Sequence, residues 1–103
     1  MNTKRIIISR TDAIGDVILT LPLAVYIKRQ NPDCDIVFLG RNYTRDIAAI
    51  CPAIDSFISW DDISENPVEE LKKLNADVII HVFPRREIAK AARKAGIQLR
   101  VGT

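Results

Sequence analysis

The chain has 103 residues, of which 48% are hydrophobic and 27% are charged. This balance is typical of a globular domain, and it excludes a collagen, a coiled coil, a disordered tail and a disulfide scaffold. The formal net charge of +2 is too small to favour nucleic acid as a partner. A chain this short seldom holds a complete two-substrate enzyme, so an enzymatic interpretation has to place part of the site elsewhere.

Charge is distributed unevenly along the sequence. The middle, 55–77, is acidic and the end, 85–100, is basic. The basic stretch is typical of a solvated helix face, or else it favours phosphate groups or an anionic membrane surface. Cys34 and Cys51 lack the spacing of metal ligands, so we expect two reduced thiols. Neither a signal peptide nor an apolar run of about 20 residues is present, and we expect a cytoplasmic protein.

Short β-branched runs alternate with longer helical patterns. Three of these runs are continuously apolar, which is typical of strands buried on both faces. The alternation predicts an α/β fold, Rossmann-like, with an open, mainly parallel sheet and helices on both faces. Strands are predicted at 5–9, 35–39, 56–59, 77–81 and 98–101, and helices at 16–30, 43–50, 67–74 and 86–95.

Local signals mark the ends of the predicted helices. Pro32 ends the first helix, because the residue before a proline avoids the helical region. Ser64 lies near the start of the third helix, and Pro67 suits its first turn. Gly96 is a C-terminal stop for the fourth. Pro22 falls inside the first helix, where it removes a backbone hydrogen bond and is expected to cause a kink.

The loop after the first strand reads Arg10-Thr11-Asp12-Ala13-Ile14-Gly15-Asp16; we call it the motif loop. Ligands of open α/β sheets bind beyond the carboxyl ends of the strands, so this loop is the first candidate site. It has one glycine where a dinucleotide fingerprint has three, and no Gly-Lys-Ser/Thr follows, which argues against a nicotinamide or P-loop function. Gly15 permits a tight turn or a close approach to the backbone.

The two aspartates of the motif loop each have two interpretations. Asp16 stands at the predicted helix start, either as an N-cap or as a general base at the mouth of the site, and the two roles are compatible. For Asp12 the alternative to a functional role is a loop turn. Arg10 ends the first strand, where it either holds Asp16 in place or contacts a phosphate of the substrate.

Further candidates follow the fourth strand. His81 ends this strand and has either a structural role or a substrate contact, since a lone histidine is not a metal site. Arg85 and Arg86 open the next helix, where cations are unfavourable. They therefore indicate either an anionic partner or a pairing with Glu87.

Three residues in the middle of the chain carry weaker signals. Arg41 follows the second strand and repeats the signal of an unmatched cation more weakly. The isolated aromatics Tyr43 and Trp60 are predicted to pack in the core or at an edge. No grouping of His, Cys, Asp and Glu has the spacing of metal ligands, so we expect no metal.

The segment 6–22 resembles the start of glycosyltransferase family 9, the heptosyltransferase family of lipopolysaccharide assembly. Members of this family open with an apolar strand, a basic residue, a short Ser/Thr/Asp loop, Gly-Asp and a helix that contains proline, which accounts for Pro22. The resemblance covers nearly the whole chain. It continues through 31–36, 51–55, 76–80 and 95–103.

The resemblance implies an activity and a domain organisation. Family 9 enzymes have two Rossmann-like domains and transfer a sugar, with inversion and without a required metal, from a nucleotide donor to a lipid-linked acceptor. Residues 1–103 are then expected to be part of the acceptor-binding N-terminal domain, with the C-terminal nucleotide-sugar-binding domain absent and the isolated chain inactive. Asp16 corresponds to the family's proposed general base, which an inverting transfer needs to take the acceptor's hydroxyl proton.

The resemblance also sets the expected partners. We expect a glycolipid or phosphosugar acceptor, no cofactor, and a nucleotide-sugar donor like ADP-heptose for the full-length enzyme. Contact with the inner face of the cytoplasmic membrane and self-association through an exposed sheet edge near Val101 are further expectations. The alternative function is a non-catalytic Rossmann-like binding or interaction domain, or an enzyme remnant. The expected substrate-binding residues are Arg10, Thr11, Asp12, Gly15, His81, Arg85 and Arg86.

Overall fold

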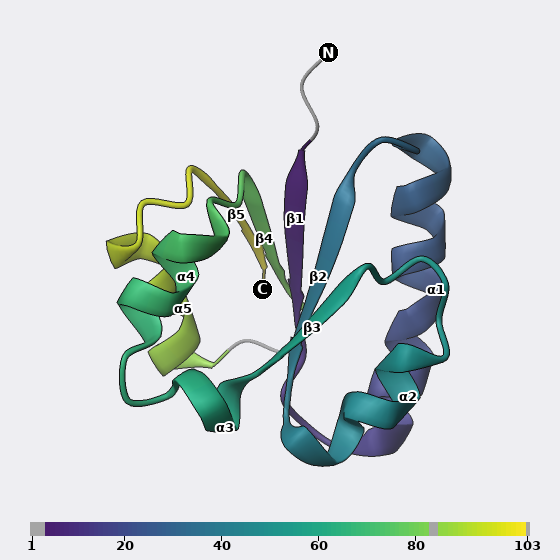
Figure 1. Cartoon of the computed structure of the whole chain (residues 1–103), viewed down its shortest axis with the longest axis horizontal. Coiled ribbons are helices and arrows are strands. Elements are labelled where there is room, and N and C mark those ends of the chain that lie inside the picture. Colours follow the sequence, from purple (N-terminus) through teal and green to yellow (C-terminus); the bar gives the residue numbers. More distant parts are fainter. Residues whose placement is uncertain (1–3, 83–84, 103) are drawn as a thin grey trace.

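The computed structural model describes residues 4–82 and 85–102, and residues 1–3, 83–84 and 103 lie outside the described part. The stretch 95–103, which resembles glycosyltransferase family 9, is therefore described up to residue 102. Five parallel strands form one sheet in the order β3-β2-β1-β4-β5 (Figure 1). The strands are β1 (Arg5–Ser9), β2 (Asp35–Gly40), β3 (Ser56–Ser59), β4 (Val78–His81) and β5 (Leu99–Gly102). The helices are α1 (Ile14–Gln30), η1 (Asn42–Thr44), α2 (Arg45–Ala49), α3 (Trp60–Ile63), α4 (Pro67–Leu74) and α5 (Arg86–Lys94).

The predicted α/β, Rossmann-like fold is confirmed. Figure 1 shows α1 and α2 on one face of the sheet and α3, α4 and α5 on the other. The chain runs from β1 outward to β3, then returns to the other side of β1 for β4 and β5. The strand order therefore reverses between β1 and β4, and ligands of such sheets bind in the crevice at this switch point.

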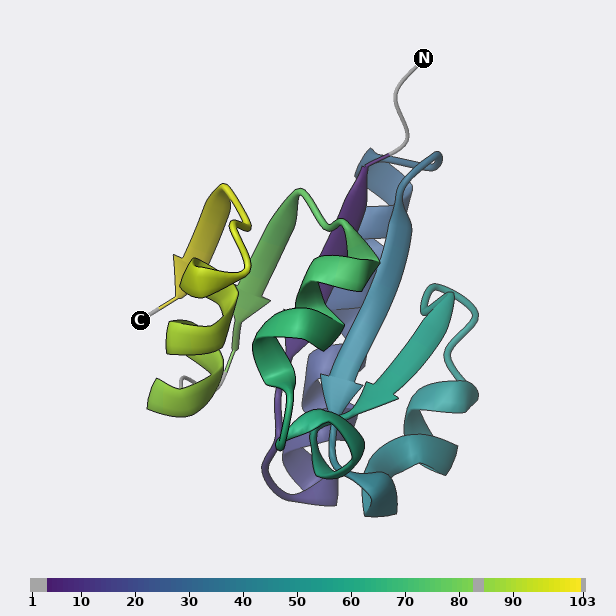
Figure 2. The same cartoon turned by 60° about the vertical axis from the view of Figure 1, so that its left-hand side comes forward.

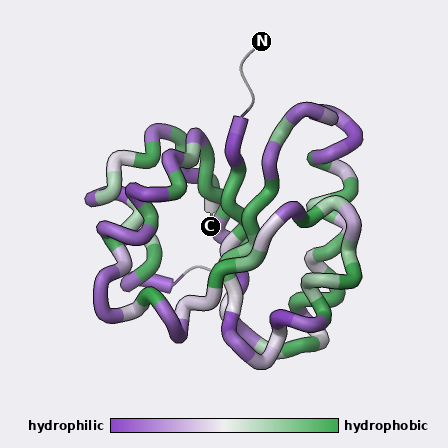
Figure 3. The backbone as a smooth tube through the Cα atoms, viewed as in Figure 1, coloured by the Kyte–Doolittle hydropathy of each residue, from purple (hydrophilic) through white to green (hydrophobic). Residues whose placement is uncertain are grey.

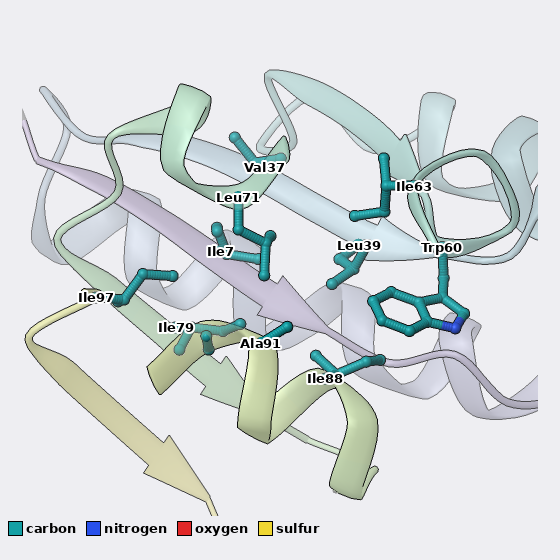
Figure 4. Close-up of a cluster of buried hydrophobic side chains, with 11 residues drawn as sticks. Ile7, Val37, Leu39, Trp60, Ile63, Leu71, Ile79, Ile88, Ala91 and Ile97 are labelled. Carbon is teal, nitrogen blue, oxygen red and sulfur yellow. The ribbon is translucent and has the colours of Figure 1, made fainter. Parts of the chain in front are cut away.

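The sheet buries apolar side chains on both of its faces. Ile7, Leu39 and Ile79 pack toward α3, α4 and α5, together with Trp60 and Ile88 (Figure 4). Figure 3 shows the hydrophobic character of the central strands along their length. The continuously apolar runs therefore mark strands covered on both faces, as predicted. The cluster on the opposite face contains Ile6, Ile8, Val17, Ala24, Cys34, Ile36, Phe38, Ala48, Cys51 and Ala53, and both cysteines are free.

The predicted start of the first helix is wrong, whereas the third predicted helix begins at Pro67 as expected. The first helix begins at Ile14, two residues before the predicted start, and continues through Pro22 to Gln30. Ser64 lies three residues before α4, near its start as predicted, and it is also the C-cap of the unpredicted short helix α3. The Oγ of Ser59 starts α3 by accepting a hydrogen bond of 3.1 Å from the backbone N–H of Asp61. This turn forms because it buries Trp60 and Ile63 against the sheet.

The end of α5 has a specific cause. Gly96 has φ +83°, in the left-handed region that favours glycine. Its N–H donates to the carbonyl of Arg93 at 3.1 Å, and the N–H of Ile97 donates to the carbonyl of Ala92 at 3.3 Å. These two bonds form a Schellman motif, which satisfies the last carbonyls of the helix. Ile97 is 2% exposed and joins the core cluster, so this turn also sets the path into β5.

We predict that Gly96→Ala lowers the free energy of unfolding by about 1 kcal/mol, because alanine is strained at positive φ. Urea unfolding followed by circular dichroism measures the change. Gly15→Ala is the matched control, because Gly15 lies in α1 and an added Cβ meets nothing within 4 Å. The same loss of stability in both variants contradicts the prediction.

Candidate functional site

The motif loop lies at the switch point of the sheet. Backbone hydrogen bonds of 3.0 Å join the N–H of Arg10 to the carbonyl of Leu39, and the N–H of Val82 to the carbonyl of Ser9. The carboxyl ends of β2, β1 and β4 therefore stay in register up to the point where the loop leaves the sheet. The parallel pairing brings residues far apart in the sequence to one edge.

Arg10 holds both aspartates of the motif loop. Its Nε lies 3.0 Å from Oδ1 of Asp12, and its Nη2 lies 3.1 Å from Oδ2 of Asp12 and 3.4 Å from Oδ1 of Asp16. The side chain of Arg10 is 17% exposed, whereas that of Asp16 is 44% exposed. Of the two predicted roles of Arg10, the geometry favours the one that positions Asp16. The Asp16 carboxylate remains accessible from solvent.

The predicted N-cap role of Asp16 is wrong. The N-cap of α1 is Ala13, and no side chain caps the helix. Asp16 lies in the first turn, where its own N–H donates to the carbonyl of Ala13 at 3.1 Å. A carboxylate in the first turn is stabilised by the helix dipole, and here it also contacts Arg10. Asp16 is therefore held by the helix and by Arg10, and neither of its carboxylate oxygens caps the helix.

Gly15 does not form the predicted tight turn. It is the second residue of α1, and of the described glycines only Gly96 has a positive φ. A Cβ added at Gly15 meets no atom of the chain within 4 Å. Neither backbone conformation nor packing within the described part of the chain requires glycine here. The other predicted role, close approach of a ligand to the backbone, is compatible with this open space.

Tyr43 supports the motif loop from a distance in the sequence. Its side chain is 55% exposed, which excludes the core position of the prediction but not the edge position, and its hydroxyl donates to the carbonyl of Asp12 at 3.0 Å. The predicted packing of Trp60 is confirmed by its 7% exposure. No pattern in the sequence signals the bond between Tyr43 and Asp12, because it depends on how η1 turns back toward α1.

Two of the predicted cations contact other parts of the chain. The Nη1 of Arg85 lies 3.5 Å from the Oγ1 of Thr11, which is buried, and its Nη2 lies 4.0 Å from Oε1 of Glu87. Arg41 lies with its Nε 2.7 Å from Oδ1 of Asp61, so its charge is matched within the chain. The N–H of Asn42 also donates to Asp61. Although burial opposes it, this backbone bond, together with Arg41, holds the pKa of Asp61 below its usual range.

His81 and Ser9 are two buried polar residues that lie side by side on β4 and β1, on the face of the sheet that α5 covers. They are register partners on β4 and β1, and they are 8% and 0% exposed. Neither the ring nitrogens of His81 nor the Oγ of Ser9 has a hydrogen-bond partner within residues 4–82 and 85–102. Burial, and then the positive charge of Arg100, lowers the pKa of His81 below its ordinary value of 6.5. Sequence reasoning missed Ser9, although its place opposite His81 follows from aligning the two strands.

The structure brings most of the predicted site residues together. Arg10, Asp12 and Asp16 share ion pairs, Arg85 reaches Thr11, and Gly15 precedes Asp16 in the chain. His81 lies at the adjoining strand end and shares a pocket with Arg86 rather than a hydrogen bond with the motif loop. Among the described residues there is no group of three or more His, Cys, Asp or Glu that is arranged to hold a metal ion.

Known proteins share parts of this sequence and this fold. No family model matches the chain. A curated protein of Haemophilus influenzae, described as a putative glycosyltransferase, is 31% identical in an alignment of 103 positions that covers 95% of this chain and 30% of that protein. The crystal structure of the glycosyl transferase family 9 from Veillonella parvula superposes on the whole chain and on 33% of its own, with a TM-score of 0.81 and 21% identity. The resemblance to glycosyltransferase family 9 is confirmed.

Two further structures have the same fold. Escherichia coli ADP-heptose lps heptosyltransferase II is 20% identical, with a TM-score of 0.81 over 97% of this chain and 30% of its own. The Escherichia coli heptosyltransferase WaaC with ADP is 18% identical, with a TM-score of 0.76 over 96% of this chain and 34% of its own. The chain thus has a heptosyltransferase-like fold and spans about a third of the length of the proteins it matches.

Within the described ranges, no helix is both long enough and apolar enough to cross a bilayer. The longest helix, α1, has 17 residues, whereas a span needs about 20 apolar residues.

We predict that Arg100→Gln raises the pKa of His81, because the variant removes a positive charge that disfavours the imidazolium. The chain has one histidine, so its ring signals can be followed by NMR without ambiguity as the pH is changed. Lys72→Gln removes a charge on α4 and is the control; it is expected to leave the pKa of His81 unchanged. An unaltered pKa in Arg100→Gln contradicts the prediction.

The lowered pKa of His81 also makes the free energy of unfolding depend on pH. The unfolded chain binds a proton at His81 near pH 6.5, whereas the folded chain binds it at lower pH. The unfolded state therefore carries more protons across this window, and the contribution of His81 to the free energy of unfolding decreases as the pH falls below 6.5. Urea unfolding at several pH values measures this slope, which His81→Gln should reduce.

Proposed function

We propose that the chain is the acceptor-binding part of an inverting glycosyltransferase of the family 9 type, with Asp16 as its general base. One observation carries the proposal: Arg10 and the first turn of α1 hold the accessible carboxylate of Asp16 at the switch point of the sheet. The relatives named above support the class of reaction. The sugar and the acceptor are part of the proposal: a heptose-like sugar and a cell-envelope glycan such as lipopolysaccharide.

The proposed reaction needs one base on the acceptor side. Asp16 accepts the proton of the acceptor hydroxyl while the hydroxyl oxygen forms a bond to the anomeric carbon of the donor sugar. On the opposite face of the sugar, the bond from the anomeric carbon to the nucleotide diphosphate breaks, and the leaving group keeps the electron pair. Attack from the face opposite the leaving group gives inversion. Arg10 acts as a positioning residue, because it fixes the orientation of the carboxylate.

The remaining site residues are proposed to bind the acceptor, a glycolipid or a phosphosugar. Gly15 leaves space for the acceptor beside Asp16, and Thr11 and Asp12 shape the loop through Arg85 and Arg10. Arg86 and Arg85 supply positive charge for phosphate groups, and His81 lies beside Arg86.

The rest of the catalytic unit is proposed by analogy with longer proteins. The relatives are about three times as long as this chain. A second, C-terminal domain is proposed to hold the nucleotide-sugar donor, similar to ADP-heptose. An acceptor of this class further favours a cytoplasmic enzyme at the inner face of the membrane.

We predict that Asp16→Asn lowers kcat by about 10²–10⁴-fold, the usual contribution of a general base, with a small change in the KM of the acceptor. The measurement is sugar transfer by a polypeptide that joins this chain to the remaining two thirds of a family 9 enzyme. Asp33→Asn removes an exposed carboxylate from the turn after α1 and is the control. Turnover near that of the parent enzyme removes Asp16 from the role of base.

Acceptor binding separates this proposal from a non-catalytic domain. Phosphosugars and phosphorylated lipid A fragments are expected to shift the backbone NMR signals of Gly15, Asp16 and Arg85 in the 103-residue chain. ADP-sugars are expected to leave these signals in place, because their site is proposed on the second domain. Absence of any shift with the acceptor fragments favours the non-catalytic interpretation.

A further inference from the structure

The pocket that His81 shares with Arg86 lies on the flank of the sheet, and no residue of the motif loop lines it. It is formed by one side of α5 and by the edge strand β5, and has a volume of about 570 Å³. Figure 2 brings this side forward and shows α5 lying beside β5. Arg86 and His81 stand at the carboxyl end of the sheet, and the pocket extends from them along α5 to Arg93.

The lining of this pocket is basic. Arg86, Lys90 and Arg93 are spaced i, i+4 and i+7 on α5, which places them on one face of the helix, and Arg100 on β5 faces the same hollow. Within residues 4–82 and 85–102, no carboxylate lies within 4.0 Å of these four cations. Elsewhere the cations that pair with aspartates are Arg5, Arg10, Lys28, Arg41 and Arg45.

The lining also contains a buried polar side chain. His81 is only 8% exposed, and its two ring nitrogens have no hydrogen-bond partner in the described part of the chain. Gly102 is the register partner of His81 on β5 and lies close against it, because a Cβ added at Gly102 would lie 2.9 Å from the Cβ of His81. A solvated helix face explains exposed cations, but it explains neither a hollow between two elements nor a buried imidazole in its lining.

Like charges at this spacing repel one another and destabilise the fold. Burial is the main cause of the lowered pKa of His81, and the positive charge of Arg100 at this pocket lowers it further. An anion bound among these cations attracts each of them and so offsets their mutual repulsion. The arrangement is therefore unfavourable when empty of negative charge and favourable around an anion.

We propose that the pocket between α5 and β5 binds a phosphate-bearing group of the size of a phosphorylated sugar. Guanidinium groups bind phosphate oxygens through paired hydrogen bonds, and lysine adds a point charge. A volume of about 570 Å³ is in the range of small-molecule sites and exceeds what a lone phosphate fills. This inference rests in part on the proposed function, because Arg86 and His81 are also proposed to contact the acceptor. Lys90, Arg93 and Arg100 belong to this pocket alone, and Asp16 does not line it.

Titration of the 103-residue chain with glucose 1-phosphate tests the proposal. We expect the ring signals of His81 to shift with saturation, and glucose without phosphate to leave them unchanged. The double variant Lys90→Gln/Arg93→Gln is expected to weaken binding about tenfold or more, since hydrogen bonds to charged groups are strong. A second arm uses vesicles of phosphatidylcholine with and without phosphatidic acid. Binding in this arm alone assigns the phosphate to a lipid headgroup rather than to a soluble sugar.

Two control variants test whether any loss of binding is specific to this pocket. Lys72→Gln/Lys94→Gln removes the same charge from α4 and from α5 outside this pocket and should bind as the parent chain does. Asp16→Asn should also bind normally, because Asp16 does not line this pocket, so a failure of Asp16 as general base is distinguishable from a failure of this proposal. Equal weakening by the control pair, or no shift of His81 with glucose 1-phosphate or with phosphatidic acid vesicles, overturns the proposal.

Discussion

The burial of β1 between β2 and β4 is the constraint on which the rest of this structure depends. Its side chains enter the core on both faces, and its backbone pairs with a parallel strand on each side. A shift of one residue would exchange the two apolar sets and place Ile7 on the wrong face. The register is therefore fixed, and with it the alignment of Ser9 with Leu39 on one side and His81 on the other. Every candidate functional residue is positioned relative to that edge.

From this edge the motif loop derives its geometry. Arg10 leaves the end of β1 with one hydrogen bond back to β2, and its guanidinium then holds Asp12 and Asp16. The start of α1 at Ile14 places Asp16 in the first helical turn, where the helix dipole and Arg10 both stabilise its carboxylate. The loop is supported from outside by Tyr43, which makes the site depend on η1 as well as on its own sequence.

Charge divides the molecule into two parts with different electrostatics. Around β2 and β3 the cations meet carboxylates: Arg41 pairs with Asp61, and Lys28 lies 2.5 Å from Asp55. Burial opposes it, but the N–H of Ile36, together with Lys28, holds the pKa of Asp55 below its usual range. Along α5 and β5 the cations of the pocket have no such partners among the described residues. The first group stabilises the fold, whereas the second is arranged for an external anion.

The sequence by itself determined the fold class, the strands and the end of α5, because continuous apolar runs and the φ requirement of Gly96 are local signals. It also placed Asp16 and Arg10 beside each other, since both belong to one loop. Tertiary structure alone decided that Asp16 is not a cap, that Tyr43 supports the loop, and that Ser9 and His81 lie buried without partners. It also decided that Arg100 joins the cations of α5. This contact depends on the pairing of β5 with β4, and no local sequence pattern encodes that pairing.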